Sequence, residues 1–290
     1  MSHDLHLHPP QCYQHQSAAL LTQHGKELIL GPLLLAELGC SVTHVTGFDT
    51  DQLGTFTRDQ ARPGSQLDAA RRKAEIGMDL SGLPLGLASE GAFVPDPHVG
   101  ILPWDVEIVI WIDRERGLEI VGMAQGEAHD HQQVLEDWPS VQQFAAQADF
   151  PNHGLVLRPN GPDDPQFVKD LHDWAALEAT FHRLHHLSAH GQVFAESDLR
   201  AHRNPTRQNL IRQAGLDLIA RLKSPCPSCA TPGYAAVSAV PGLQCRACGT
   251  PTRLPVATLW RCVRCGHEER KPLVSPSQRA DPSRCECCNP

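Results

Sequence analysis

The chain has 290 residues, of which 41% are hydrophobic and 20% charged, and its net charge is −8. This composition is typical of a globular protein with one large domain or two medium ones. No apolar run approaches the roughly 18 residues that a membrane span needs, so we expect no membrane association. The N-terminus lacks a basic stretch followed by an apolar core, so we expect no secretory signal and interpret residues 1–16 as a disordered leader.

Charge is distributed unevenly along the chain. The segment from Arg221 to the end contains ten of the 25 Lys and Arg residues but only four of the 33 Asp and Glu residues. An acidic body with a basic tail is compatible with nucleic-acid contact by the tail. Two zinc sites with four thiolates each would carry about −2 apiece and offset much of this excess, so the basic signal is weak.

The first predicted elements are a strand, a helix and a second strand. The apolar run Ala18–Thr22 predicts a strand, and Glu27–Leu38 has helical character that ends at Gly39. Pro32 lies inside this pattern, so the helix is either kinked or begins later. Ser41–Val45 predicts the second strand.

A second helix and three strands follow. Apolar residues at three- and four-residue spacing predict a helix over Ser65–Leu80. Leu83–Ala88 predicts a strand, with Glu90 in a turn at its end. Val106–Asp113 and Leu118–Ala124 are strongly apolar and are separated by a charged turn, which predicts a hairpin.

The next stretch predicts a helix over Val134–Ala148 and a strand over His153–Arg158. Asp164 followed by Pro165 is typical of a helix start, and an apolar stripe follows it. A further strand begins at Val193. Strand, long helix and strand in this order predict a βαβ crossover with parallel pairing.

Charged side chains follow the strand that begins at Val193 and precede a helix predicted to begin at Asn204-Pro205. Open α/β sheets bind ligands at the carboxyl ends of their strands, so this segment is a candidate phosphate or metal site. The alternative is a solvated, salt-bridged turn. The charged and titratable residues of the segment are Glu196, Asp198, Arg200, His202, Arg203 and Arg207.

Nine of the eleven cysteines lie after residue 225, and eight of them form four Cys-x-x-Cys pairs. Two such pairs supply the four thiolates of one tetrahedral zinc site, so four pairs predict two Zn²⁺ ions. Clustered pairs of this kind indicate zinc rather than disulfides and favour a reducing, cytoplasmic location. The pairs are Cys226/Cys229, Cys245/Cys248, Cys262/Cys265 and Cys285/Cys288.

Spacing alone leaves the partnering of these pairs open. We favour consecutive pairing, the first pair with the second and the third with the fourth, although interleaved and nested arrangements are also possible. Cys287 could replace Cys288, and His267 is a weaker substitute. A site with four thiolates has no open coordination position, so we expect the zinc to be structural.

The segment Gly64–Gly91 resembles the core of the inosine triphosphatase-like nucleotide pyrophosphatases, which place an NAxxKA-type helix before a strand that ends in an acidic turn. Leu21–Lys26 resembles the TxNxxK-type turn of that superfamily. The resemblance implies that Thr22 and Lys26 contact phosphates and that Glu90 holds Mg²⁺ or orients water. It also implies nearby positive charge from Arg71, Arg72 and Lys73, since phosphoryl transfer is catalysed mainly by positioning and charge neutralisation.

From Leu20 onward the chain also resembles an uncharacterised bacterial family without an established activity, which implies that its two halves belong together. The sequence thus predicts an α/β domain over residues 17–222, with a mixed or parallel sheet and flanking helices. A zinc-ribbon domain with two four-cysteine sites follows over residues 223–290.

Two functions remain open. The first is a metal-dependent hydrolase of a nucleotide or another phosphorylated substrate, with zinc as a structural ion and Mg²⁺ at the active site. Its catalytic candidates are Glu90, Asp198, His202 and Glu196, and its phosphate-binding candidates are Thr22, Lys26, Arg72, Arg200 and Arg207.

The second function is a nucleic-acid or protein binding module without catalysis. Its contacts would be made by the basic residues of the zinc ribbons, and the acidic domain would be a scaffold. A homodimer is possible under both hypotheses. The ribbon residues concerned are Arg246, Arg253, Arg261 and Arg264.

Overall fold

The computed structural model describes residues 12–50, 64–97, 99–275 and 278–290, so most of the predicted leader lies outside the described residues. The chain divides into two compact units, Gln14–Ile219 and a second unit that contains Ala220–Pro290. Within the described ranges, none of the helices combines the length and the apolar character that a bilayer span requires.

The Gln14–Ile219 unit contains a mixed five-stranded sheet of order β2-β1-β3-β4-β5. β1 pairs in parallel with β2 and β3, and the long strands β3, β4 and β5 pair antiparallel. The predicted mixed α/β fold is confirmed. The strands are β1 (Ser17–Leu21), β2 (Ser41–Val45), β3 (Leu85–Pro95), β4 (Pro103–Asp113) and β5 (Leu118–Glu127).

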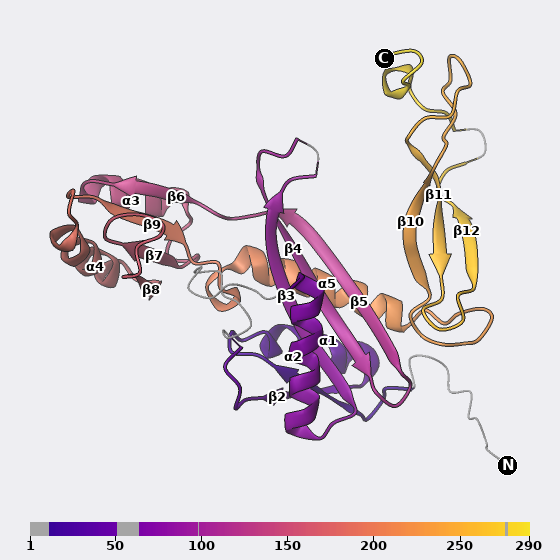
Figure 1. Ribbon diagram of the computed structural model, residues 1–290, viewed down its shortest axis with the longest axis horizontal. Coiled ribbons are helices and arrows are strands. Elements are labelled where there is room, and N and C mark those ends of the chain that lie inside the picture. The colour runs from indigo at the N-terminus through magenta and orange to yellow at the C-terminus, as the bar shows by residue number, and fades with distance from the viewer. Residues whose placement is uncertain (1–11, 51–63, 98, 276–277) are drawn as a thin grey trace. The chain divides into compact units, whose positions relative to one another are not determined.

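Helices cover both faces of this sheet (Figure 1). On one face, Ala70 and Ala74 of α2 (Gln66–Ser81) pack against Ile108 and Ile110 of β4. On the other face, α5 (Pro205–Leu222) lies so close to β5 that a Cβ on Gly122 would meet its backbone. Only glycine permits this contact, and it fixes α5 over the strands.

The first elements follow the sequence prediction closely. α1 spans Glu27–Leu38 without interruption and contains Pro32, and Gly39 ends it in the left-handed conformation. α2 begins after Ser65, whose hydroxyl accepts the amide N–H of Asp68 in a capping box. The third strand is longer than predicted, however. It continues from Ala88 to Pro95, so Glu90 lies within a strand and not in a turn at its end.

A second sheet of the same unit has the order β6-β9-β7-β8. The helices α3 (Trp138–Gln147) and α4 (Trp174–Leu187) bury Val141, Phe144, Leu177 and Phe181 in its core. The strands are β6 (Gln132–Leu135), β7 (Leu155–Arg158), β8 (Val168–Leu171) and β9 (Val193–Ser197).

The predicted βαβ crossover is wrong. β7 and β9 pair antiparallel, because the extra strand β8 reverses the chain before α4 begins. The Asp164-Pro165 start is also wrong, since the Asp164 carboxylate accepts the N–H of Gln166 in a turn, and Asp173 caps α4 instead. In the same way, the helix predicted from Val134 begins only after Asp137, which caps α3.

The second unit holds an antiparallel three-stranded sheet of β10 (Ala235–Pro241), β11 (Pro255–Arg261) and β12 (Glu268–Pro272). Its buried cluster consists of Tyr234 and two cysteines, with Trp260 packed against them. So small an apolar core contributes little stability, and folding then requires another source of free energy such as bound metal.

Candidate functional site

The turn between β1 and α1 places a lysine against the neighbouring strand. β1 ends beside the middle of β3, so Ser89 lies next to the turn. The ammonium of Lys26 donates to the carbonyl oxygen of Ser89 at 2.6 Å and is almost fully buried. Burial lowers the pKa of Lys26 to about 8. Thr22 is also buried, and its hydroxyl accepts the N–H of His24 at 3.4 Å.

Glu90 is buried beside this turn and forms an ion pair with Lys73 of α2. Gln66 fixes the strand here, because its side-chain amide donates to the backbone oxygen of Glu90 at 2.7 Å. Arg72, the predicted phosphate ligand, is exposed. Of the three residues expected to supply nearby positive charge, Lys73 is the one that pairs with Glu90.

A second group of charges lies on the opposite face of β3 and β4. The guanidinium of Arg207 donates from Nε to Oε1 of Glu107 at 2.7 Å, and Asp105 Oδ2 is 3.9 Å from the same nitrogen. These three side chains are buried. They pack on Gly91, where an added Cβ would lie 2.6 Å from the Glu107 carboxylate. Glycine at this position therefore permits the ion pair.

His24 and His202 stack at the mouth of the β1–α1 turn, with ring centroids 5.2 Å apart. Burial and the positive charges of His202, Lys26, Arg200 and Lys73 lower the pKa of His24 to about 3. A neutral imidazole held among cations indicates positive potential at this point, which favours an anionic ligand.

The structure gives Asp198 and Glu196 other partners. The Asp198 carboxylate accepts from Nε and Nη2 of Arg200 at 2.9 and 2.6 Å, and Glu196 accepts from Arg158 at 3.0 Å. Asp198 therefore positions Arg200, which also pairs with Asp170 at 3.0 Å. Neither carboxylate joins Glu90 directly. The two groups approach each other at His24, whose pKa responds to both Lys73 and Arg200.

We call Lys26, Lys73, Glu90, Asp105, Glu107 and Arg207 the buried charge cluster. The sequence prediction selected Lys26, Glu90 and Arg207 and named Lys73 only as one source of nearby positive charge, and it left out Asp105 and Glu107. The sequence does contain a signal for the two acids. Asp105 and Glu107 are separated by one residue in a largely apolar strand, which places both side chains on one face of the sheet.

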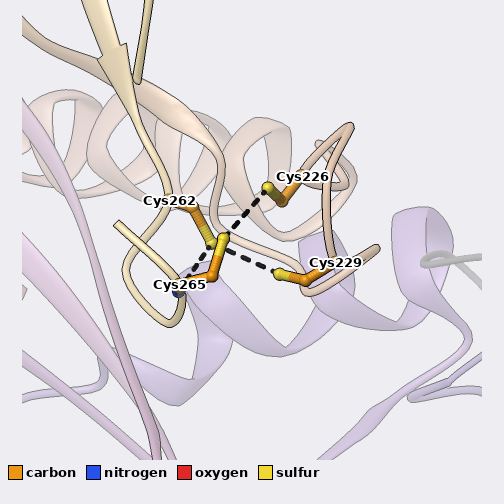
Figure 2. Close-up of side chains that lie close together, drawn as sticks. All are labelled: Cys226, Cys229, Cys262 and Cys265. Atoms are coloured by element: carbon orange, nitrogen blue, oxygen red, sulfur yellow. Dashed lines mark hydrogen bonds between the residues drawn. The ribbon is translucent and has the colours of Figure 1, made fainter. Parts of the chain in front are cut away.

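The second unit gathers eight cysteines into two tetrads. Cys226, Cys229, Cys262 and Cys265 form one tetrad, and Cys245, Cys248, Cys285 and Cys288 form the other. Figure 2 shows the sulfurs of the first tetrad directed toward a common centre. In each tetrad the sulfur atoms lie within 4.8 Å of one another, so the clusters are positioned to bind metal ions.

The first three knuckles share one local structure. In each, the amide of the first cysteine donates to the carbonyl five residues later, at 2.9 to 3.0 Å. The residue after the second cysteine has a positive φ, which explains glycine there in two of the three. In the first knuckle, hydrogen bonding with Thr231 lowers the pKa of Cys229 to about 6 and favours the thiolate that a metal binds. The residues with positive φ are Ala230, Gly249 and Gly266.

The preference for consecutive pairing is wrong, because the tetrads are interleaved. β10 and β11 are antiparallel, so the first knuckle, before β10, meets the third knuckle, after β11. The second and fourth knuckles meet at the opposite end of the sheet. Strands of seven residues separate the two ends by roughly 23 Å, too far for consecutive knuckles to share a metal. Cys287 and His267 lie outside both tetrads.

The tetrads have the size of a tetrahedral metal site. A tetrahedron with metal–sulfur bonds of about 2.3 Å has edges of about 3.8 Å. The closest sulfur pairs are 3.7 and 3.6 Å apart in the first tetrad and 3.9 and 3.6 Å apart in the second. Four thiolates at these distances leave no position for a substrate, so any role of the metal is structural.

Comparison with known proteins identifies one matching protein family. No curated protein and no solved structure matches the chain. A family described as a domain of unknown function, DUF6671, matches residues 73–290, which include the second half of α2, both sheets of the first unit from β3 onward and all eight tetrad cysteines. The chain therefore belongs to the DUF6671 family.

Proposed function

We propose that the Gln14–Ile219 unit binds a nucleotide or another phosphorylated substrate at the β1–α1 turn and hydrolyses a phosphate anhydride there. The observation that carries this proposal is the gathering of two ammonium groups beside the carboxyl end of β1: buried Lys26, which donates to the Ser89 carbonyl, and half-buried Lys73, which pairs with the buried carboxylate of Glu90. Open α/β sheets bind ligands at this edge.

The residues suit the chemistry of phosphoryl transfer, which depends on positioning and on neutralising charge. Lys26 and Lys73 would contact the phosphates, and the stacked pair of His24 and His202 would border them. When Lys73 turns to the substrate, its ion-pair partner Glu90 is released to orient a water molecule or to bind a metal ion. This arrangement also supports the resemblance to the inosine triphosphatase-like pyrophosphatases.

Mg²⁺ fits this site only together with the substrate. The cysteine tetrads are the only groups of three or more converging ligands among the described residues, and Glu90 alone would offer Mg²⁺ one carboxylate. Mg²⁺ usually binds through one or two carboxylates, several waters and substrate phosphates, so one carboxylate is sufficient. The ion would neutralise developing charge on the phosphates.

For the second unit we propose two structural Zn²⁺ ions, one in each tetrad. Four thiolates with these sulfur separations favour Zn²⁺ over hard cations, which prefer oxygen ligands. The small apolar core of this unit supports the proposal, because metal binding then supplies much of its folding free energy.

The alternative, a binding module that uses the arginines of the ribbons, has less support. Arg246, Arg253 and Arg261 each form an ion pair with a neighbouring carboxylate. A nucleic-acid phosphate would have to displace those acids. If binding is the function, affinity for nucleic acid should fall steeply with salt and with loss of Arg261 and Arg264.

The test of the hydrolase compares adjacent positions of α2. We expect zinc-loaded wild type to release phosphate or pyrophosphate from a panel of nucleotides with Mg²⁺ or Mn²⁺. Glu90→Gln and Lys73→Met should each lower kcat/KM by about 100-fold or more, since each removes a group that contacts the reacting phosphates.

Arg72→Met is the matched control, because it removes one positive charge from the exposed side of the same helix. Its kcat/KM should stay within about twofold of wild type. The proposed site would be contradicted if wild type released neither phosphate nor pyrophosphate from any nucleotide of the panel. An equal loss of kcat/KM in Arg72→Met and Lys73→Met would also contradict it.

A further inference from the structure

Two carboxylates of the buried charge cluster lack the hydrogen bonds that buried charges require. Asp105 and Glu107 are alternate residues of β4, so their side chains lie on the same face of the sheet. Both are completely buried. Opposite them on β3, Glu107 faces Gly91 and Asp105 faces Phe93, neither of which offers a polar side chain. The two acids therefore occupy one enclosed region under α5.

Arg207 satisfies only one of their four oxygens by hydrogen bonding. Its Nε donates to Glu107 Oε1, whereas Glu107 Oε2 and both oxygens of Asp105 have no hydrogen-bond donor within the part of the chain that the structure describes. The nearest guanidinium nitrogen is 3.9 Å from Asp105 Oδ2, which is an ion-pair distance but too long for a hydrogen bond. Two buried, like-charged carboxylates with three unsatisfied oxygens would be costly.

A shared proton lowers this cost, because it removes one negative charge and a carboxylic acid can donate to a neighbouring carboxylate, which satisfies two of the three oxygens. Pairs of carboxyl groups in one site commonly hold one proton between them for this reason. Burial, followed by the negative charge of Glu107, raises the pKa of Asp105 to about 7, which agrees with a proton held at this pair near neutral pH.

The protonation state changes the charge beside the β1–α1 turn. The charged groups that face Asp105 are Glu107 from its own strand, Arg207 from α5 and Lys26 from the turn. When both acids are ionised, they balance the two cations. When they share a proton, one positive charge remains uncompensated, and Lys26 brings it to the place where we propose the phosphates bind.

We propose that Asp105 and Glu107 share one proton, and that this proton strengthens anion binding at the β1–α1 turn by leaving Lys26 and Arg207 only half compensated. The second half of this inference rests on the proposed phosphate site, and the first does not. Asp105 is accordingly a positioning residue that acts through Lys26 and Arg207, and it has no contact with substrate.

The first test measures stability against pH without any ligand. A carboxyl group whose pKa is higher in the folded than in the unfolded state stabilises the fold below about pH 4, and this stabilisation is lost as pH rises to about 7. Zinc-loaded Asp105→Asn should lack this loss and should melt at a higher temperature than wild type at pH 8.

Asp113→Asn is the matched control. Asp113 is a completely buried acid of the same strand, but its carboxylate accepts the side chain of Arg116 at 2.9 Å. This variant should melt at a lower temperature and keep the pH dependence of wild type. The infrared carbonyl band of a protonated carboxylic acid, present in wild type at pH 6, should also be missing in Asp105→Asn.

The second test titrates the zinc-loaded protein with sulfate, which remains doubly charged, from pH 5.5 to pH 7.5, a range in which Lys26 keeps most of its charge. As pH rises over this range, the affinity of wild type for sulfate should fall by about fivefold or more, which is the usual size of a coupling between two binding sites. Asp105→Asn should lose no more than a small part of it. Any remaining dependence would come from Lys26, whose own pKa of about 8 lies just above this range.

The outcomes separate the two halves of the proposal. The shared proton would be ruled out if the stability difference between wild type and Asp105→Asn did not change with pH and wild type showed no infrared band of a protonated acid. The expected stability profile together with no sulfate binding at any pH would overturn the coupling and the proposed phosphate site, while the shared proton would stand. Equal pH dependence of sulfate binding in both proteins would overturn the coupling alone.

Discussion

The cysteine tetrads and the buried charge cluster both gather ionisable side chains, but they are assembled in different ways. Each tetrad consists of two knuckles, and each knuckle is a short local motif with its own backbone hydrogen bonds. The charge cluster draws single residues from the β1–α1 turn, α2, β3, β4 and α5. Local motifs are visible in the sequence, whereas a tertiary cluster is visible only where the fold brings its strands and helices together.

The two regions also differ in how they relate to stability. Metal binding to four thiolates contributes folding free energy, because the unfolded chain does not hold the preformed site. Buried carboxylates and ammonium groups must give up hydration, and their mutual attraction offsets this cost only when the geometry is good. The cost of such a cluster supports the binding site that we propose, because perturbed ionisable groups are common at functional sites.

The largest expected effect distinguishes interleaved from consecutive pairing. Structural zinc sites contribute roughly 10–16 kcal/mol to folding, so the loss of one site should be obvious. Cys226→Ser combined with Cys262→Ser removes two ligands from one tetrad and leaves the other intact. This protein should retain one zinc ion after dialysis against a chelator.

The companion variant combines Cys226→Ser with Cys245→Ser, which removes one ligand from each tetrad. It should lose both ions under the same dialysis, whereas Cys287→Ser should keep both. Metal analysis of the dialysed proteins gives the count. The opposite pattern, with one ion retained by the second combination and none by the first, would restore consecutive pairing.

The sequence revealed all eight ligands but not their partners, for a physical reason. Ligand spacing in the chain reports only how a single knuckle is built. Which knuckles meet depends on the antiparallel pairing of β10 with β11, which brings the start of one strand beside the end of the other. The antiparallel strands between the first and third knuckles were not part of the sequence prediction, and without them consecutive pairing was the simplest arrangement.

The charge cluster was predictable only in part. Lys26 and Glu90 follow from a resemblance at the β1–α1 turn and β3, and both occupy the predicted neighbourhood. Choosing between Arg72 and Lys73 required the rotation of α2 about its axis. A helix turns by about 100° per residue, so adjacent residues face different surroundings. Arg72 faces solvent, and Lys73 faces Glu90.

A smaller effect should reveal how closely Arg207 and Glu107 pack on the sheet. In Gly91→Ala the new Cβ would lie 2.6 Å from the Glu107 carboxylate, and the ion pair would have to shift. We expect a loss of about 1–3 kcal/mol in the free energy of unfolding, the usual cost of overpacking. Chemical denaturation with zinc present measures it.

Gly161→Ala is the control, because an added Cβ at that position meets no atom within 4 Å. It should change the free energy of unfolding by less than about 0.5 kcal/mol. Equal stabilities for wild type and Gly91→Ala would show that the ion pair does not depend on the bare backbone of β3.

The second sheet contains a helix whose start was predicted at the wrong residue from the sequence. Asp164-Pro165 and Asp173 both resemble helix starts, and the apolar residues after Asp164 continue without a break into those of α4. Periodicity could not separate them, because the four residues of β8 are too few to show a period of two. The pairing of β8 with β7 decides the outcome, and that pairing is a tertiary contact.

The smallest expected effect tests this boundary. The carboxylate of Asp173 accepts the N–H of Ala176 at 2.8 Å and satisfies one of the free amides at the start of α4. Asp173→Ala should therefore lower the free energy of unfolding by about 1 kcal/mol. Glu178→Ala, which removes an exposed acid from the same helix, should change it by less than half as much. If the two variants are equally stable, the cap contributes nothing, and the boundary of α4 is then set by the turn after β8 alone.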